Sequence, residues 1–141
     1  MAFQPFTLSR LPKITFGHGT RSQLPALLAS YGRNVLIVLG ARHFQQGAHW
    51  AEIQSGMRAI GLNWNVLSVE GEPSPKFVDD AVRQYGHLGM DVVVGIGGGS
   101  ALDAAKAIAG LLKPGNSVMD HLEGVGPELP YQGPATTFIA V

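Results

Sequence analysis

The chain has 141 residues, of which 45% are hydrophobic and 14% charged, and its 10 basic residues balance its 10 acidic ones. This length and composition indicate one folded domain with a substantial core, and the absence of net charge argues against a nucleic-acid or anionic-membrane surface. The absence of cysteine excludes disulfides, thiolate metal sites and a cysteine nucleophile. The sequence contains neither a secretory signal nor an apolar run of about 18 residues, so a cytoplasmic location is expected.

In the first half of the chain, short apolar runs alternate with segments of helical periodicity. The run Val35–Leu39, closed by Gly40, is typical of a parallel strand buried on both faces. Pro12 cannot donate to a central ladder, which assigns the first strand to a sheet edge. The predicted elements are an edge strand at 11–16, a helix at 21–31, a strand at 35–39, a helix at 44–60 and a strand at 64–69.

The second half continues the alternation. Ser74 followed by Pro75 is a typical helix N-terminus and predicts a helix through Tyr85. The elements predicted beyond it are a strand at 90–96, a helix at 101–112, a long loop at 113–134 and a strand at 136–141. The whole pattern predicts a doubly wound, mostly parallel, Rossmann-like α/β sheet. Because the last predicted strand is apolar, we expect residues 1–141 to be one domain truncated at Val141.

Three consecutive glycines, Gly97, Gly98 and Gly99, followed by Ser100, join a predicted strand to a predicted helix. Glycines allow a tight turn and the close approach of an anion, and the free N–H groups of a helix start, with the Ser100 hydroxyl, would face a phosphate. A valine at Gly98 is expected to fill the phosphate space and to resist a positive φ. No lysine occupies the P-loop position, which disfavours Walker-type nucleotide hydrolysis. The alternative is a structural turn without a ligand.

Asp103 lies one turn into the same predicted helix. It can accept a hydrogen bond from a bound ligand, or it can stabilise the helix start and pair with Lys106. The residues themselves leave both interpretations open. The five histidines show no metal-ligand spacing such as H-x-x-x-H.

The segment from Gly97 to Ala109, G-G-G-S-A-L-D-A-A-K-A-I-A, resembles the G-G-G-S-x-x-D-x-A-K-x-(I/V)-A segment of the iron-containing (group III) alcohol dehydrogenase family. The resemblance covers nearly the whole chain. It extends to P-K-I-T-F-G-H-G at 12–19, V-L-I-V-L-G at 35–40, E-P-S-P at 72–75 and F-I-A-V at 138–141.

The resemblance implies a two-domain enzyme that transfers a hydride between a small alcohol or aldehyde and a nicotinamide cofactor, NADP or NAD. This chain would be the dinucleotide-binding domain. The family's second, helical domain, which holds a divalent metal (iron or zinc) through one Asp and three His, would be absent. By the same resemblance, Gly97, Gly98, Gly99 and Ser100 hold the pyrophosphate, and Asp103 faces the nicotinamide carboxamide. We expect no metal ligand and no turnover in this chain by itself.

Two further expectations concern cofactor choice and assembly. Many NAD-using members of the family have Asp where this chain has Gly40, and Arg42 follows closely. This departure favours NADP or dual use, because no carboxylate repels a 2′-phosphate and Arg42 can pair with one. The extended segment Thr7–Phe16 presents an unpaired edge, and family members are often dimers built on this region, so a homodimer through this strand is expected.

Two alternatives remain at this point. One is a phosphofructokinase-like phosphotransferase, which would also use a glycine-rich loop that ends in serine. Against it, Ser100 follows Gly99 directly, and the aspartate expected inside that loop is missing. The other is a non-catalytic nucleotide-binding module.

Overall fold

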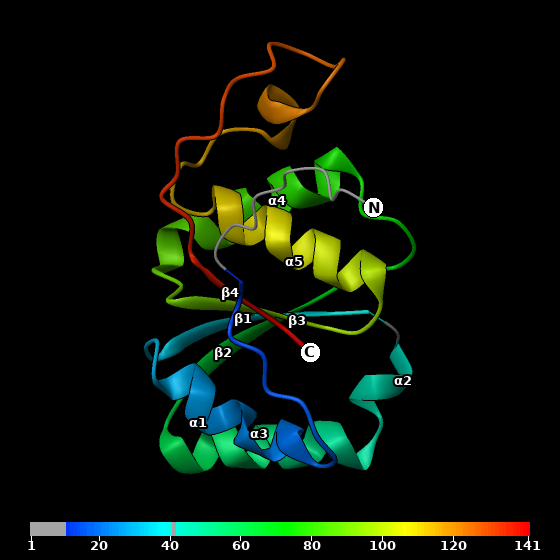
Figure 1. Ribbon diagram of the computed structural model, residues 1–141, viewed down its shortest axis with the longest axis vertical. Coiled ribbons are helices and arrows are strands. Elements are labelled where there is room, and N and C mark those ends of the chain that lie inside the picture. Colours follow the sequence, from blue (N-terminus) through cyan, green and yellow to red (C-terminus); the bar gives the residue numbers. More distant parts are fainter. Residues whose placement is uncertain (1–10, 41) are drawn as a thin grey trace, which may run out of the picture.

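A single parallel sheet organises the chain in the computed structural model, which describes residues 11–40 and 42–141. The strand order is β2-β1-β3-β4, and every neighbouring pair is parallel (Figure 1). This topology confirms the predicted doubly wound, parallel α/β fold. The strands are β1 (Asn34–Leu39), β2 (Asn63–Ser68), β3 (Val92–Ile96) and β4 (Thr137–Ala140).

Helices cover both faces of the sheet, α1 and α3 on one side and α4 and α5 on the other (Figure 1). The helix predicted over 44–60 is divided in two, because Gly47 adopts an extended conformation and caps the second part. The α-helices are α1 (Leu24–Ala29), α2 (Arg42–Gln45), α3 (Ala48–Ile60), α4 (Pro75–Tyr85) and α5 (Gly99–Leu111). The 3-10 turns are η1 (Thr20–Gln23), η2 (Gly86–Leu88) and η3 (Val118–His121).

The core lies on both sides of the central strands β1 and β3. Ile37 of β1 packs among side chains of α1 and α3, whereas its neighbours Leu36 and Val38 pack against α4 and α5. All three side chains are completely buried. Successive residues of a strand point to opposite faces, so a central strand with helices on both sides must be apolar throughout. This is the physical reason for the continuous apolar run in the sequence.

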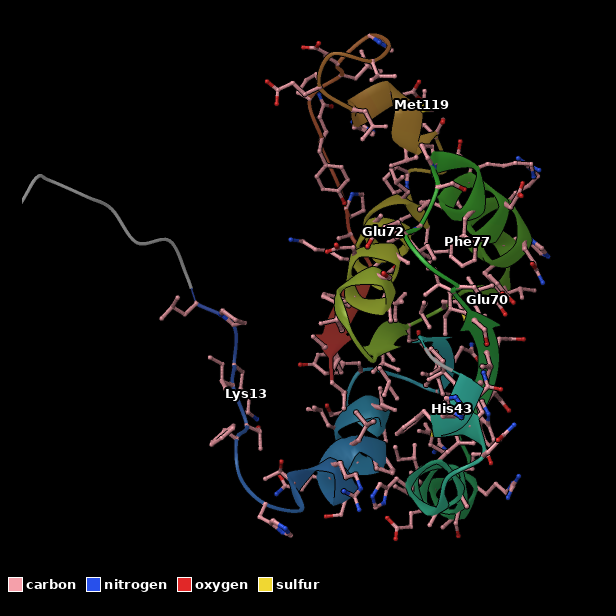
Figure 2. The ribbon with its side chains drawn as sticks, turned by 90° about the vertical axis from the view of Figure 1, so that its right-hand side faces the viewer. Lys13, His43, Glu70, Glu72, Phe77 and Met119 are labelled. Atoms are coloured by element: carbon pink, nitrogen blue, oxygen red, sulfur yellow. The ribbon has the colours of Figure 1, made fainter. Side chains whose placement is uncertain are left out.

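The edge strand predicted over 11–16 is wrong for the chain by itself. These residues form no regular secondary structure and lie outside the sheet. Figure 2 shows the segment around Lys13 standing away from the body of the molecule. Leu11, Ile14 and Phe16 are 71%, 76% and 98% exposed. Pro12 lacks an N–H, and the segment does not pair with β2 or β4, the two edges of the sheet.

The predicted long loop at 113–134 is an ordered connection at the amino end of β4. Asp79 of α4 accepts hydrogen bonds from the Ser117 hydroxyl and from the Val118 N–H, the latter at 2.8 Å. The Tyr131 hydroxyl donates to the Gly110 carbonyl at 2.9 Å. These contacts hold the loop against α4 and α5. Within the residues that the structure describes, no helix is long and apolar enough to cross a membrane.

Candidate functional site

The chain reverses its winding direction between β1 and β3. From β1 it passes outward to β2 by way of α3, and it then crosses back over β1 to β3 by way of α4. In open α/β sheets the crevice at such a switch point, outside the carboxyl ends of the strands, is the usual place for a ligand. The ends of three neighbouring strands are level here, because Gly40 N–H donates to the Ile96 carbonyl at 3.2 Å and Val69 N–H to the Leu39 carbonyl at 2.9 Å.

The glycine turn, Gly97–Gly99, follows β3 directly at this crevice. Gly97 has a φ of +140°, and a Cβ there would lie 3.3 Å from the Gly40 nitrogen and 3.3 Å from the Ala101 Cβ. Gly97 is therefore required by the backbone and by its neighbours.

Gly98 and Gly99 border open space instead, since a Cβ on either would meet nothing within 4 Å. The expected positive φ at Gly98 is wrong: Gly98 is the N-cap of α5 with a φ of −79°. The positive φ occurs at Gly97 instead, because that residue makes the sharp bend out of β3. Gly98 already lies at the start of the helix.

Ser100 lies in the first turn of α5, with its hydroxyl directed to a carboxylate. Its Oγ donates to Glu72 Oε1 at 3.3 Å. Figure 2 shows Glu72 and Glu70 on the segment that leads from β2 to α4. Helix geometry leaves the first N–H groups of α5 without intrahelical acceptors, and the macrodipole favours negative charge at this end. In this structure, Glu72 supplies negative charge beside the predicted phosphate position.

A pocket of about 490 Å³ connects the three strand ends. It is lined by residues 98–101 of the glycine turn and α5, by Gly40 and His43 after β1, and by residues 69–71 after β2. The structure thus brings the predicted residue Gly40 together with Gly98, Gly99 and Ser100. A groove of similar volume, about 500 Å³, lies between α4 and residues 115–117 and includes no part of the glycine turn.

Two pocket residues, His43 and Glu70, were not among the site residues predicted from the sequence. Both are exposed and line the pocket beside Gly40. The signal that could have identified Glu70 is its position immediately after a predicted strand, where ligands bind in sheets of this kind. His43 had no comparable signal, because its place depends on the path of the chain after β1.

Among the predicted residues whose side chains the structure describes, Gly97 and Asp103 do not line the pocket. Asp103 is exposed on α5, one turn beyond Ser100 and on the same helix face. The part of the chain that the structure describes contains no hydrogen bond or ion pair between Asp103 and Lys106. Arg42 begins α2, but the position of its side chain lies outside what the structure describes.

Metal-ligating side chains do not gather anywhere in residues 11–40 and 42–141. No group of three or more His, Asp or Glu side chains in these residues could hold a metal ion. The described residues therefore do not fit the metal centre that the family resemblance implies, and no catalytic step can be derived through such a centre from this chain.

Comparison with known proteins decides the family. The model of the family described as iron-containing alcohol dehydrogenase matches residues 12–141. The chain belongs to the iron-containing alcohol dehydrogenase family. This membership confirms the resemblance inferred from the glycine–aspartate motif, and it gives no support to the phosphofructokinase-like alternative.

Individual members of the iron-containing alcohol dehydrogenase family show the extent of the similarity. The chain is 32% identical over 107 residues to the protein named "Probable NADH-dependent butanol dehydrogenase 1" of Bacillus subtilis, covering 75% of this chain and 28% of that protein. It is 33% identical over 105 residues to NADH-dependent butanol dehydrogenase B of Clostridium acetobutylicum, covering 74% of this chain and 27% of that protein. Among the solved structures, NADH-dependent butanol dehydrogenase A of Thermotoga maritima shares the fold. Its TM-score is 0.80 at 24% identity over 96% of this chain and 34% of that one.

The chain spans between 16% and 28% of the length of the curated family members that it matches. The family model, which matches residues 12–141, covers the parallel sheet and the glycine turn.

Proposed function

We propose that this chain is the nicotinamide-dinucleotide-binding part of an alcohol dehydrogenase that transfers a hydride between a small alcohol or aldehyde and its cofactor. The observation that carries the proposal is the pocket of about 490 Å³ at the switch point. It is bordered by Gly98 and Gly99 of the family motif, which face open space. Ligand pockets typically measure about 300–1,000 Å³. The residues present therefore fit a dinucleotide.

Each residue of the glycine turn has a distinct part in the proposal. Gly97 makes the bend, and Gly98 and Gly99 leave room for the pyrophosphate beside the free N–H groups at the start of α5. The Ser100 hydroxyl, which donates a hydrogen bond to Glu72, can donate to a bound phosphate as well as to Glu72 or in its place. Asp103, on the same helix face as Ser100, accepts a hydrogen bond from the nicotinamide carboxamide. When bound, the cofactor supplies the carbon that accepts or donates the hydride.

Binding of cofactor by the purified chain tests this proposal. Calorimetric titration with NADH, NADPH and ADP-ribose is expected to show one site. The Gly98→Val variant is expected to lose most of this affinity and to remain folded, because a Cβ at this position borders open space, with no heavy atom within 4 Å, on the side proposed for the phosphate. A folded Gly98→Val variant that binds all three ligands as the parent does would contradict the proposal, since the turn would then be structural only.

The end of β1 does not by itself exclude NADPH. Gly40 presents no carboxylate, and the closely following Arg42 is the residue proposed to pair with a 2′-phosphate. A side chain at position 40 has room, because the nearest atom to its Cβ would be the Ala101 Cβ at 3.5 Å. Gly40→Asp is therefore expected to fold and to weaken NADPH binding about tenfold through repulsion of the 2′-phosphate. Titration of NADPH fluorescence measures the change, and an unaltered affinity would mean that Gly40 does not face the ribose.

We further propose where the metal is held, which substrate is used, and the cellular location and oligomeric state of the enzyme. The divalent metal, iron or zinc, would be held outside this chain, by one Asp and three His. The substrate is a small alcohol or aldehyde, and no nucleic acid or membrane takes part. We propose a cytoplasmic enzyme that forms a homodimer through the segment 7–16, of which residues 11–16 lie within the described part of the chain.

A further inference from the structure

Glu70 stands at the end of β2, two strands away from the glycine turn. It follows Val69, whose N–H donates to the Leu39 carbonyl at 2.9 Å, so the end of β2 is level with the end of β1. Its side chain is exposed and lines the pocket that also contains Gly40, Gly98 and Ser100. Figure 2 shows it where β2 passes into the connection to α4.

The spacing of the strands separates two ends of this pocket. Neighbouring strands lie about 4.8 Å apart, so the glycine turn after β3 and Glu70 after β2 are separated by roughly 10 Å across β1. Gly40, at the end of β1, places no side chain between them. A nucleoside whose phosphate rests on the glycine turn can lie across this bare strand end, with its ribose toward β2.

The two carboxylates after β2 differ in what they contact. The Glu72 carboxylate accepts a hydrogen bond from the Ser100 hydroxyl at 3.3 Å, beside the proposed phosphate position. Glu70, nearer to the strand end, lines the pocket itself. A carboxylate has room for about four hydrogen bonds, so Glu70 can accept from a ligand alongside its neighbours in the protein. In dinucleotide-binding folds generally, an acidic residue that follows a neighbouring strand accepts from the ribose hydroxyls.

We propose that Glu70 is the residue that selects NADH over NADPH, an inference that rests on the proposed function. Its carboxylate accepts hydrogen bonds from the two adenosine ribose hydroxyls of NADH. The same negative charge repels the 2′-phosphate of NADPH. Glu70 thereby supplies, from β2, the carboxylate that is missing at Gly40, and it reverses the preference for NADP or dual use that Gly40 and Arg42 favour when considered without it.

The test compares the affinities of NADH and NADPH for the purified chain and its variants. The parent is expected to bind NADH about tenfold more tightly than NADPH, and Glu70→Gln is expected to reduce this ratio about tenfold. Glu70→Asp, which keeps the charge, is expected to retain most of the preference. Glu123→Gln removes one exposed carboxylate from the loop at the opposite end of the sheet and is the matched control, with an expected ratio equal to that of the parent.

A second measurement needs no variant. ADP-ribose and its 2′-phosphorylated form differ only at the atom that Glu70 is proposed to sense, and the parent chain should bind the unphosphorylated form about tenfold more tightly. A parent that prefers the phosphorylated ligand, or a Glu70→Gln variant with an unchanged ratio, would overturn the assignment of Glu70 and leave the proposed function standing. A chain that binds none of these ligands would overturn the proposed function itself.

Discussion

Adjacent glycines in the glycine turn differ in what a side chain would meet. Gly97→Ala is expected to destabilise the fold by about 1–3 kcal/mol, because alanine resists a φ of +140° and its Cβ would press on Gly40 and Ala101. Gly98→Ala is the control, because Gly98 has a φ of −79° and a Cβ there would border open space. Its free energy of unfolding should lie within about 0.5 kcal/mol of that of the parent. Urea unfolding followed by circular dichroism measures both. Equal stability of the two variants would show that the bend at Gly97 is not strained.

Asp91 stabilises the fold at the amino ends of β1 and β3, the end of the sheet opposite to the pocket. Its Oδ2 accepts from the backbone N–H of Arg33 at 2.8 Å and from that of Asn34 at 2.9 Å, which ties the start of β1 to the start of β3. Gly32 must lack a side chain here, since a Cβ would lie 2.2 Å from the Asp91 carboxyl carbon.

Removing this acceptor is expected to lower stability. Asp91→Ala leaves two N–H groups without their partner, and we expect a loss of about 1–3 kcal/mol in the free energy of unfolding. Asp91→Asn keeps one acceptor oxygen and should lose less. Chemical unfolding of the parent and the two variants gives their order of stability. An alanine variant as stable as the parent would show that water replaces the carboxylate with no loss in the free energy of unfolding.

At the scale of elements, the segment 11–16 is predicted as a strand that the structure does not form. It has the composition of a strand, yet it forms none within a single chain and exposes Leu11, Ile14 and Phe16. Exposed extended segments of this kind pair with other chains. The expected partner is a second copy.

Self-association should therefore depend on this segment. Phe16→Ser is expected to weaken a dimer at micromolar concentration, and deletion of residues 1–10 should do the same. Val125→Ser changes a half-exposed apolar side chain in the loop 113–134 and serves as the control. Sedimentation velocity at several concentrations reports the result. A monomeric parent, or a dimer indifferent to Phe16→Ser, would contradict the expectation.

At the scale of the whole molecule, binding and chemistry are expected to be separable. The described residues contain the pocket but no group of side chains that could hold a metal ion. The purified chain is therefore expected to bind NADH without oxidising primary alcohols and without stoichiometric metal. Elemental analysis and an NAD(P)⁺-coupled assay check both points, and turnover that follows bound iron or zinc would contradict them.

A chimera extends this test to function. When residues 1–141 replace the matching segment of NADH-dependent butanol dehydrogenase B of Clostridium acetobutylicum, the chimera is expected to reduce butanal with NADH. The same chimera with Gly98→Val is expected to be inactive but to retain its metal. An inactive parent chimera that still binds both NADH and metal would show that this chain does not position the cofactor for hydride transfer.

The sequence by itself determined the alternation of strands and helices, the two central strands, the start of α4 at Pro75 and the glycine turn at the start of α5. These features depend on periodicity, capping and turn residues, which act between residues close together in the chain. The family motif from Gly97 to Ala109 is equally local, and it was sufficient to indicate the family.

Only the tertiary structure decided which residues share the pocket and which strand finds a partner. Ser100 faces Glu72, 28 residues earlier, and Gly40 abuts Gly97 across the switch point. Glu70 reaches the same pocket because β2, β1 and β3 are adjacent, an order that the strand pattern does not specify. The segment 11–16 has strand-like residues but pairs with neither β2 nor β4, the two edges of the sheet. Side-chain chemistry and local periodicity can be read from the sequence directly. Proximity between residues far apart in the chain depends on how the strands pair, and this pairing is a property of the folded sheet.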